Sequence, residues 1–293
     1  MALNIATFKT RAATAGVFVA VMLTGMLWNH WSFFVLFSVI HFGCWTEYQK
    51  LVGLIDNNYT DISPFHKYGV MIAGWCIMLY CTNDAFTLFG IQLSAIGWWL
   101  GIIAIVALPV IELLFSKQLE LKNIGWSAFG LLYISVSLAL MMDLRCFGMM
   151  KNGTGVSIDF LGFVLPLGIL IALWINDTCA YLVGSFIGRT PFSKISPKKT
   201  WEGTAGGAVL CIVVVALLGW WAEAFEVADW IAIASIVAVF GVIGDLFESK
   251  LKRMANVKDS GSIMPGHGGF LDRFDSLLLA TPFVWLYVIL FMK

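Results

Sequence analysis

Residues 203–222 read GTAGGAVLCIVVVALLGWWA, a run without a single Asp, Glu, Lys or Arg. A helix that crosses the hydrocarbon core of a bilayer needs roughly 20 apolar residues. The run shows no alternation of apolar and polar residues, so it does not fit a strand of a transmembrane barrel. It therefore predicts a membrane-spanning α-helix.

Similar apolar stretches recur along the whole chain, and they predict an all-α polytopic membrane protein with about nine transmembrane helices. The stretches are 12–28, 31–45, 68–82, 94–115, 124–142, 160–187, 203–222, 227–244 and 276–292. The second and third are short, so they must borrow flanking residues or cross a thinned bilayer. We expect no cleavable signal peptide, because the first stretch lacks a small-residue cleavage site and another span follows at once.

The composition agrees with a chain whose surroundings are lipid. Of its 293 residues, 60% are hydrophobic and 12% are charged, and the mean hydropathy is +0.87. An ordinary soluble domain is about 45–50% apolar and about 25% charged. A soluble enzyme and a disordered protein are therefore excluded. The net charge is zero, so nucleic acid is not an expected partner.

The distribution of Lys and Arg orients the predicted helices. With nine spans and a cytoplasmic N-terminus, 15 of the 18 basic residues face the cytoplasm, and Arg145, Lys151 and Lys293 face outward. Cytoplasmic loops are enriched in positive charge, so the asymmetry favours this orientation. We divide the chain into two regions. Residues 1–155 form an N-terminal transmembrane scaffold that faces lipid and could supply dimer contacts. Residues 156–293 form a C-terminal transmembrane region that contains the candidate catalytic site.

Ionisable groups inside the spans are few. His41 is interpreted as a hydrogen-bonding core residue, and Glu112 as a side chain that reaches the membrane boundary. The six cysteines form no CxxC pattern and are interpreted as packing residues. By contrast, Asp177 lies within the sixth span and Asp245 ends the eighth. An aspartate at the bilayer centre costs about 2.5–3.5 kcal/mol, so both are functional candidates.

The two most polar predicted loops, 188–202 and 245–275, are both cytoplasmic. The second interleaves cations with anions, and three glycines around His267 let backbone N–H groups approach an anion. Carboxylates and Asn suit Mg²⁺, whereas Lys and Arg suit phosphate oxygens. Together they predict phosphoryl or nucleotidyl transfer. Their location at the membrane surface indicates a lipid phosphate and a cytosolic nucleotide as reactants.

The second loop contains one long motif, Ser249-x-Leu-Lys-Arg-x4-Lys258-Asp-x-Gly261-x3-Pro265-x-His267-Gly-Gly-Phe-x-Asp272-Arg-x-Asp275. It closely resembles the signature of the phosphatidate cytidylyltransferases, also called CDP-diacylglycerol synthases, without a departure. Further stretches look like other motifs of that family: Asn176-Asp177-x3-Tyr181, Gly188-Arg189, Ser196-Pro-Lys-Lys-Thr-x-Glu-Gly203 and Gly244-Asp245-x2-Glu248-Ser249. The resemblance covers roughly residues 170–280, and the first half fits only as apolar spans.

The resemblance implies a membrane nucleotidyltransferase, commonly a homodimer, that acts in phospholipid synthesis. CTP and phosphatidate would give CDP-diacylglycerol and pyrophosphate, with Mg²⁺ required and a second cation compatible with the site. We expect Asp245 and Asp272 to hold the metal, with Asn176, Asp177 and Glu248 as further groups around it. A lipid phosphate oxygen is already a nucleophile, so no protein nucleophile is needed.

The remaining candidates are expected to contact the two phosphorylated substrates. The basic ones would bind either CTP or the lipid phosphate, and the sequence does not assign each to one of the two. They are Lys198, Lys199, Lys252, Arg253, Lys258 and Arg273. His267 is expected to donate to a phosphate or, as a weaker alternative, to transfer a proton. Ser196 and Thr200 are expected to orient the triphosphate loop. Asp259, Gly268 and Gly269 complete the predicted substrate site.

Three alternatives belong to other classes. A transporter or flippase of a phosphorylated lipid or nucleotide would also need many spans and inward charges, although the polar groups cluster at one side and no repeat pairs the halves. A prenyl or CDP-alcohol transferase would need DDxxD-type or DGx2AR-type motifs, which the sequence lacks. A structural subunit would leave the loop carboxylates unexplained. Short loops favour a bacterial inner membrane, with the active site facing the cytoplasm.

Overall fold

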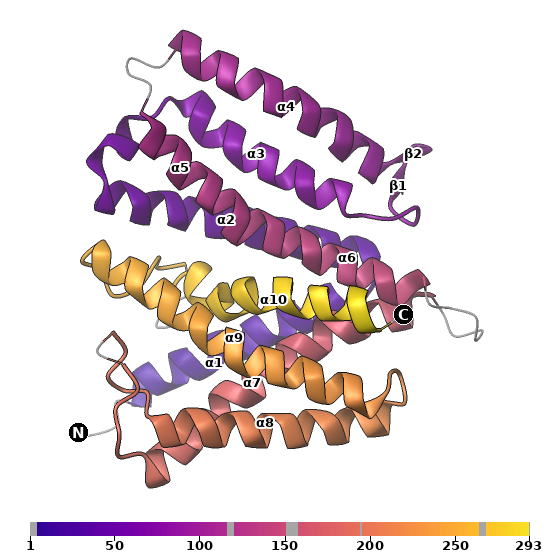
Figure 1. The fold of residues 1–293 in the computed structure, drawn as a ribbon, viewed down its shortest axis with the longest axis vertical. Helices are drawn as coiled ribbons and strands as arrows, with labels where there is room; N and C mark the ends of the chain where they lie inside the picture. Colours follow the sequence, from indigo (N-terminus) through magenta and orange to yellow (C-terminus); the bar gives the residue numbers. More distant parts are fainter. Residues whose placement is uncertain (1–4, 116–119, 151–157, 194, 264–267, 293) are drawn as a thin grey trace. The chain divides into compact units, whose positions relative to one another are not determined.

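The computed structural model describes residues 5–115, 120–150, 158–193, 195–263 and 268–292. The chain forms two compact units (Figure 1). The first comprises Met1–Asp143 and Met254–Arg273, and the second comprises Leu144–Arg253 and Phe274–Lys293. The stretch Met254–Arg273, which holds most of the long motif, therefore groups with the N-terminal helices.

Each of the nine apolar stretches coincides with a helix or a run of helical segments, and none extends more than two residues beyond it. In chain order the elements are α1 (Ile5–Leu27), α2 (His30–Ile55), η1 (Asn57–Asp61), α3 (Pro64–Tyr80), β1 (Thr87–Leu88), β2 (Ile91–Gln92), α4 (Leu93–Phe115), α5 (Leu121–Gly130), η2 (Leu131–Val136), α6 (Ser137–Met150), α7 (Ile158–Ile187), α8 (Trp201–Ala222), α9 (Val227–Met254) and α10 (Leu271–Phe291). The predicted all-α architecture is confirmed, with one small antiparallel hairpin, β1–β2, before α4.

Six helical segments within the described residues are long and apolar enough to cross a membrane. They are Leu93–Leu114, Leu121–Phe147, Gly162–Ile187, Trp201–Ala222, Val227–Met254 and Leu271–Phe291. A polytopic membrane protein is thus confirmed, while the count of nine spans and their orientation stay predictions.

Among the helices that are longer than hydropathy predicts, three bear on the site. Helix α2 continues to Ile55 instead of ending at residue 45, and α9 continues to Met254 instead of residue 244. Helix α10 begins at Leu271, five residues before the predicted start. Hydropathy ends a span at the first charged residues, but the backbone stays helical where those side chains find polar partners. The extensions place much of the predicted second loop on helices.

Two ionisable residues differ from their predicted positions. Arg145, expected in an outer loop, lies in α6 and is fully buried. Glu112, expected at the membrane boundary, is buried in α4, where Oε2 lies 2.9 Å from Nδ1 of His66. On the other side of that ring, Nε2 of His66 lies 2.7 Å from Oγ of Ser127. Because a partner on another helix satisfies the Glu112 carboxylate, this side chain does not need to reach water.

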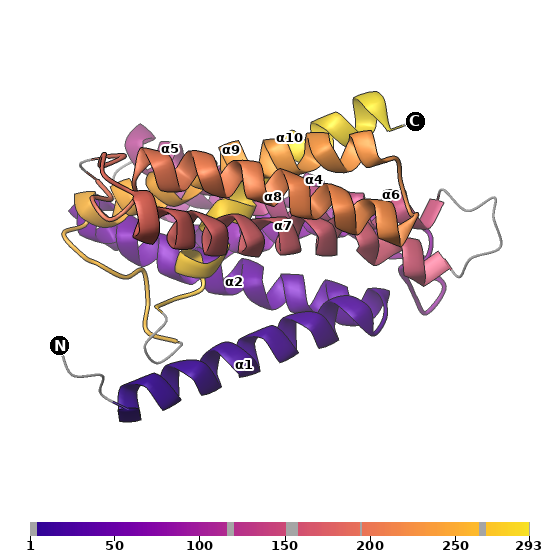
Figure 2. The same cartoon turned by 90° about the horizontal axis from the view of Figure 1, so that it is seen from below.

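Helix α2 provides much of the core of the first unit, and its partners come from distant segments. Nε1 of Trp45 donates to Oγ of Ser135 at 2.8 Å, and Nε2 of His41 lies 3.0 Å from the same oxygen. Ser135 belongs to the π-helical turn η2, and a Cβ at Gly74 of α3 would collide with its hydroxyl. The prediction that His41 is a core hydrogen-bonding residue is confirmed. Helices α1 and α2 meet at the turn that joins them and diverge from there (Figure 2).

Small residues set the spacing of the helices in the second unit. Helices α7 and α8 lie side by side, and a Cβ at Gly207 would stand 2.6 Å from the backbone nitrogen of Ala180. A Cβ at Gly203 would stand 2.8 Å from Cα of Gly184. Helices α9 and α10 also approach closely, because a Cβ at Gly244 would stand 2.6 Å from the carbonyl oxygen of Asp275. Such contacts are typical of helix pairs in membranes, and they bring the polar ends of these helices together.

Candidate active site

The segment that leads from α7 into the first turn of α8, residues 188–193 and 195–202, we call the basic loop. Its two limbs are held by hydrogen bonds from the nitrogen of Phe192 to the oxygen of Lys199 at 2.8 Å and from Trp201 to Thr190 at 3.0 Å. Thr200 caps α8, since its hydroxyl accepts the Gly203 N–H at 3.1 Å. A Cβ at Gly188 would stand 2.5 Å from that hydroxyl, so only glycine fits there. The two limbs are therefore fixed against each other at the start of α8.

Glu202, which the sequence analysis quoted in a motif but gave no role, locks this turn. Its carboxylate accepts the backbone N–H of Arg189 at 3.1 Å and the hydroxyl of Thr190 at 2.8 Å. The N–H of Thr190 also donates to it, at 3.1 Å. One side chain at the start of α8 thus fixes both the entry and the exit of the basic loop. Its place in the first turn of α8, where the helix dipole favours a carboxylate, was the available signal.

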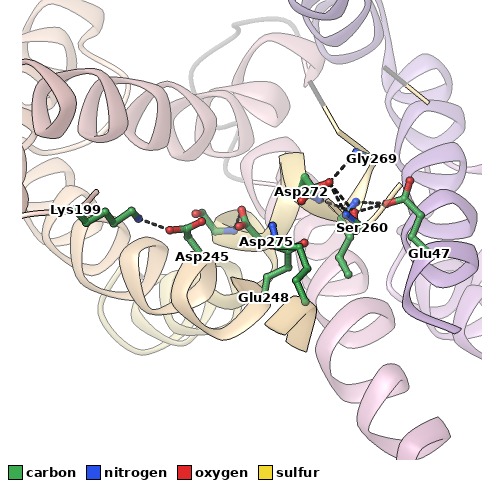
Figure 3. A network of polar contacts seen from close by, with 11 residues as sticks. Glu47, Lys199, Asp245, Glu248, Ser260, Gly269, Asp272 and Asp275 are labelled. Carbon is green, nitrogen blue, oxygen red and sulfur yellow. Dashed lines mark hydrogen bonds and ion pairs between the residues drawn. The ribbon is translucent and has the colours of Figure 1, made fainter. Parts of the chain in front are cut away.

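The basic loop presents Lys199 to α9, where its Nζ forms an ion pair with Oδ2 of Asp245 (Figure 3). Both side chains are partly exposed, with relative accessibilities of 29% and 28%. Lys198, the preceding residue, is exposed, and Ser196 accepts the Lys199 N–H through its backbone oxygen at 3.1 Å. Of the predicted substrate-binding residues of the loop, Lys199 is the one brought to a predicted metal ligand.

A second ion pair lies further along α9. Nζ of Lys252 contacts Oε2 of Glu248, and the Glu248 side chain is fully buried. Asp245, Glu248 and Lys252 recur at spacings of three and four residues, so they line one face of the helix. Burial of a charge is costly unless it is paired, which accounts for the lysine that follows the two carboxylates on this face.

Asp275, at the start of α10, is the carboxylate that the predicted metal set omitted. It is buried, and Oδ1 accepts the N–H of Ser276 at 2.6 Å. It lies close enough to Asp245 and Glu248 to interact with the negative charge of each, and with the positive charge of Lys252. We call Asp245, Glu248, Asp275, Lys199 and Lys252 the acid–base cluster; all five belong to the second unit. The long motif contained the signal for Asp275, its last residue.

The side chains of the acid–base cluster can be compared with those that bind a magnesium ion in proteins. Within the described residues, no three His, Cys, Asp or Glu side chains stand in a geometry that holds a metal. The kind of donor nevertheless fits, since three carboxylates gather in one unit and oxygen ligands suit a hard cation. Lysine ammonium groups lie against two of these carboxylates, where a positive charge is needed. The cluster therefore matches Mg²⁺ in chemistry.

Two neighbours on α7 point in different directions. Asn176 is buried, and Oδ1 has no hydrogen-bond partner among the described residues. Asp177 is exposed on its own unit, as is Tyr181. A buried, unpaired amide oxygen is costly, so Asn176 is the better placed of the predicted pair to accept from a ligand.

The described residues between α9 and α10, 255–263 and 268–270, belong to the first unit, and we call them the signature loop. Oδ2 of Asp272 holds it from the first turn of α10. This oxygen accepts the Ser260 N–H at 2.8 Å, the Ser260 hydroxyl at 2.9 Å and the Gly269 N–H at 2.8 Å. Gly268 has φ +84°, a conformation that favours glycine. The N–H of Gly269 is thus taken up by Asp272, and its predicted contact with substrate stays a prediction.

Glu47 of α2 supports the signature loop from the other side, and the sequence analysis missed it. Its carboxylate accepts the Ser260 hydroxyl at 2.8 Å and the N–H groups of Phe270 at 2.9 Å and Leu271 at 2.8 Å (Figure 3). The predicted end of the second span at residue 45 left Glu47 in a loop. Continuing the helical periodicity would have placed it on one face with the buried residues Ile40, Cys44 and Leu51.

Four of the other predicted residues have exposed side chains. They are Arg253, Lys258, Asp259 and Arg273. His267 lies outside the described residues. The predicted metal pair is divided, with Asp245 in the second unit and Asp272 in the first, and its joint binding of a metal stays a prediction.

Comparisons with known proteins point in one direction. A model described as the cytidylyltransferase family matches residues 9–291. The chain is 28% identical to the phosphatidate cytidylyltransferase of Haemophilus influenzae over 291 residues, which cover 94% of this chain and 96% of the relative. It is 32% identical to that of Bacillus subtilis over 219 residues, covering 74% and 76%. With the Synechocystis protein of the same name it shares 34% over 202 residues, covering 63% and 69%.

Proposed function

Because the chain belongs to the cytidylyltransferase family, we propose that it transfers a cytidylyl group from CTP to phosphatidate. The products are CDP-diacylglycerol and pyrophosphate. The relatives that match most of this chain carry the name phosphatidate cytidylyltransferase. The transporter alternative gains no support from them.

The observation that carries the proposal is the acid–base cluster on α9 and α10. A phosphate oxygen of the lipid forms a bond to the α-phosphorus of CTP, while the bond from that phosphorus to the bridging oxygen of the β-phosphate breaks. The electron pair leaves with pyrophosphate. The barrier is repulsion between two anions together with charge growing on the leaving group, and fixed cations lower both. Lys199 and Lys252 are cations held in place by carboxylates.

The two lysines suit different tasks in this reaction. Lys199 is partly exposed at the end of an ordered loop, so it can exchange its contact with Asp245 for a phosphate oxygen. Lys252 is buried beside Glu248 and stays within the cluster. We assign Lys199 to the incoming phosphates and Lys252 to the charge balance of Asp275 and Glu248. Arg253 and Arg273, both exposed, remain candidates for the outer phosphates.

Mg²⁺ is the cofactor that we propose for this site. Asp245 would be its principal ligand, with Glu248 and Asp275 beside it, and Asp272 remains a predicted ligand. When bound, the ion would neutralise charge on the transferring phosphate and the leaving group. The carboxylates would bind the ion as Lys199 turns to the substrate.

The membrane arrangement that we propose has nine spans, a cytoplasmic N-terminus and the site on the cytoplasmic face. The uneven distribution of Lys and Arg along the sequence supports it. Bacterial relatives support a bacterial inner membrane, and the family resemblance supports a homodimer. A single cysteine placed at Ser262, in a variant without native cysteines, should label only from the cytoplasmic side; labelling from outside would overturn the topology.

The activity itself is tested with purified protein, radiolabelled CTP, phosphatidate and Mg²⁺. Label should move into the organic phase as pyrophosphate is released in equal amount. Movement of phosphatidate or CTP across sealed vesicles without pyrophosphate release would contradict the proposal and favour a transporter.

A further inference from the structure

The signature loop is held by a carboxylate that lies more than 200 positions away in the sequence. Glu47, on α2, is almost entirely buried, with 5% of its surface exposed. All its described hydrogen bonds come from neutral donors, namely the Ser260 hydroxyl and the N–H groups of Phe270 and Leu271. The two N–H groups lie at the start of α10, where the helix dipole favours a negative charge. The protein thus fills this anion-binding position with its own side chain.

The contacts of Glu47 join the two limbs of the signature loop. Ser260 lies on the limb that leaves α9, whereas Phe270 and Leu271 lie on the limb that enters α10. Glycines on both limbs make the room, because a Cβ at Gly261 or at Gly269 would collide with the Glu47 carboxylate. Two independent features of the loop, its donors and its glycines, are therefore fitted to this one carboxylate.

Glu47 is also connected to a residue of the proposed chemistry. The Ser260 hydroxyl lies 2.8 Å from Oε2 of Glu47 and 2.9 Å from Oδ2 of Asp272 (Figure 3). Its single proton can serve only one of these oxygens at a time, so the backbone N–H groups of Ser260 and Gly269 complete the contacts of Asp272. Movement of Glu47 would release Ser260 and, with it, the orientation of Asp272.

We propose that Glu47 is a positioning residue for cytidylyl transfer, which fixes the signature loop and through Ser260 orients Asp272. The inference rests on the proposed function. The negative charge is the necessary property, because each of the three donors needs an acceptor and a neutral amide would turn an N–H₂ group toward at least one of them. A displacement of about 1 Å in a catalytic loop lowers turnover about 10²-fold.

The experiment compares Glu47→Gln, Glu47→Asp and Ser260→Ala in the full-length protein. We expect kcat per folded molecule to fall about 10²-fold in Glu47→Gln. Glu47→Asp keeps the charge on a shorter stem, and we expect it to retain at least tenfold more activity than Glu47→Gln. The control is Glu120→Gln: Glu120 is an exposed carboxylate of the same unit that accepts from the Asn58 amide, and its loss should leave kcat unchanged.

Hydrogen exchange supplies a readout that does not depend on activity. The amides of Phe270 and Leu271 should exchange faster in Glu47→Gln than in the parent, with no change in α7 and α8. If the parent makes no CDP-diacylglycerol, the proposed function fails, and the exchange data still test the placement of the loop. A Glu47→Gln protein with parental kcat, or one as active as Glu47→Asp, would overturn the proposal. Should Glu47→Gln not fold, Ser260→Ala decides: a fall in kcat supports the proposal and parental kcat overturns it.

Discussion

The acid–base cluster and the signature loop both contain carboxylates, but they hold them in opposite ways. In the cluster, Asp245 and Glu248 contact lysine ammonium groups. In the loop, Glu47 and Asp272 accept from backbone N–H groups and from one hydroxyl. A lysine on a flexible stem can exchange partners, whereas backbone donors are fixed by the fold. The first region is built to meet charged reactants, and the second to stay in one conformation.

This difference separates two requirements of a nucleotidyl transfer. Charge must be neutralised as the pyrophosphate leaves, and the groups that do so must be held without reorganisation. The paired cations Lys199, in the basic loop, and Lys252, on α9, meet the first requirement. The neutral donors around Glu47 meet the second. The comparison therefore predicts that variants in the two regions differ in kind as well as in size.

The largest loss should come from Asp245→Asn. The change keeps the shape of the side chain but removes the charge that binds Lys199 and the proposed Mg²⁺, so we expect turnover to fall about 10³-fold. The protein should fold normally, because Asp245 is partly exposed. Steady-state assays with CTP and phosphatidate, together with size-exclusion chromatography, measure the two effects.

Asp272→Asn makes the comparison sharper. Asp272→Asn should also remove most turnover. Unlike Asp245→Asn, it should raise hydrogen exchange at Ser260 and Gly269, whose N–H groups donate to Asp272. Full activity in both well-folded variants would end the proposal that these carboxylates hold the metal. Faster loop exchange in Asp245→Asn as well would erase the distinction between the two regions.

A smaller loss is expected for Lys199→Ala. Removing the ammonium group leaves Asp245 without its ion-pair partner and the incoming phosphates without a cation, so kcat/KM for CTP should fall about 10²-fold. The matched control is Lys250→Ala, because Lys250 is exposed on α9 and lies outside the cluster. Unchanged kinetics for both substrates in Lys199→Ala would remove this lysine from the site.

The sequence predicts one of the two regions much better than the other. Asp245 and Glu248 stand out because charge is rare in apolar helices, and the long motif follows them directly. Lys199 stands out as one of four basic residues in a short polar loop. Glu47 does not stand out: its partners Ser260 and Phe270 lie more than 200 positions away, and no local pattern encodes that contact. Hydropathy also ended α2 and α9 too early, because it cannot register that a buried partner satisfies a charged side chain. The apolar helices themselves were all found.

Glu202→Gln should have a moderate effect. Glu202 closes the basic loop through the N–H groups of Arg189 and Thr190 and the Thr190 hydroxyl. The amide can still accept some of these bonds, so we expect kcat/KM for CTP to fall about tenfold, in keeping with loss of about 1.4 kcal/mol. Glu223→Gln, at the opposite end of α8, is the control. A loss that equals that of Lys199→Ala would mean that Glu202 does more than hold the loop.

The smallest effect should come from an ion pair that belongs to neither region. Oδ2 of Asp56 lies 2.7 Å from Nζ of Lys122, and the Asn58 N–H donates to Oδ1. The hydrogen bond from Lys122, followed by that from Asn58, holds the pKa of Asp56 below its ordinary value. A depressed carboxyl pKa contributes stability above the unfolded-state value of about 3.9, and that contribution disappears as the pH falls through the folded-state value.

Asp56→Asn should therefore lower stability by only about 0.5 kcal/mol at pH 7, since Lys122 is well exposed to solvent. Thermal unfolding at pH 7 and below pH 4 measures the effect, and the difference between variant and parent should shrink at the lower pH. Cytidylyl transfer should be unchanged. If Asp56→Asn instead lost activity as Asp245→Asn does, a lysine–carboxylate pair outside the proposed site would matter as much for turnover as one inside it. The contrast between the two regions would then rest on location alone.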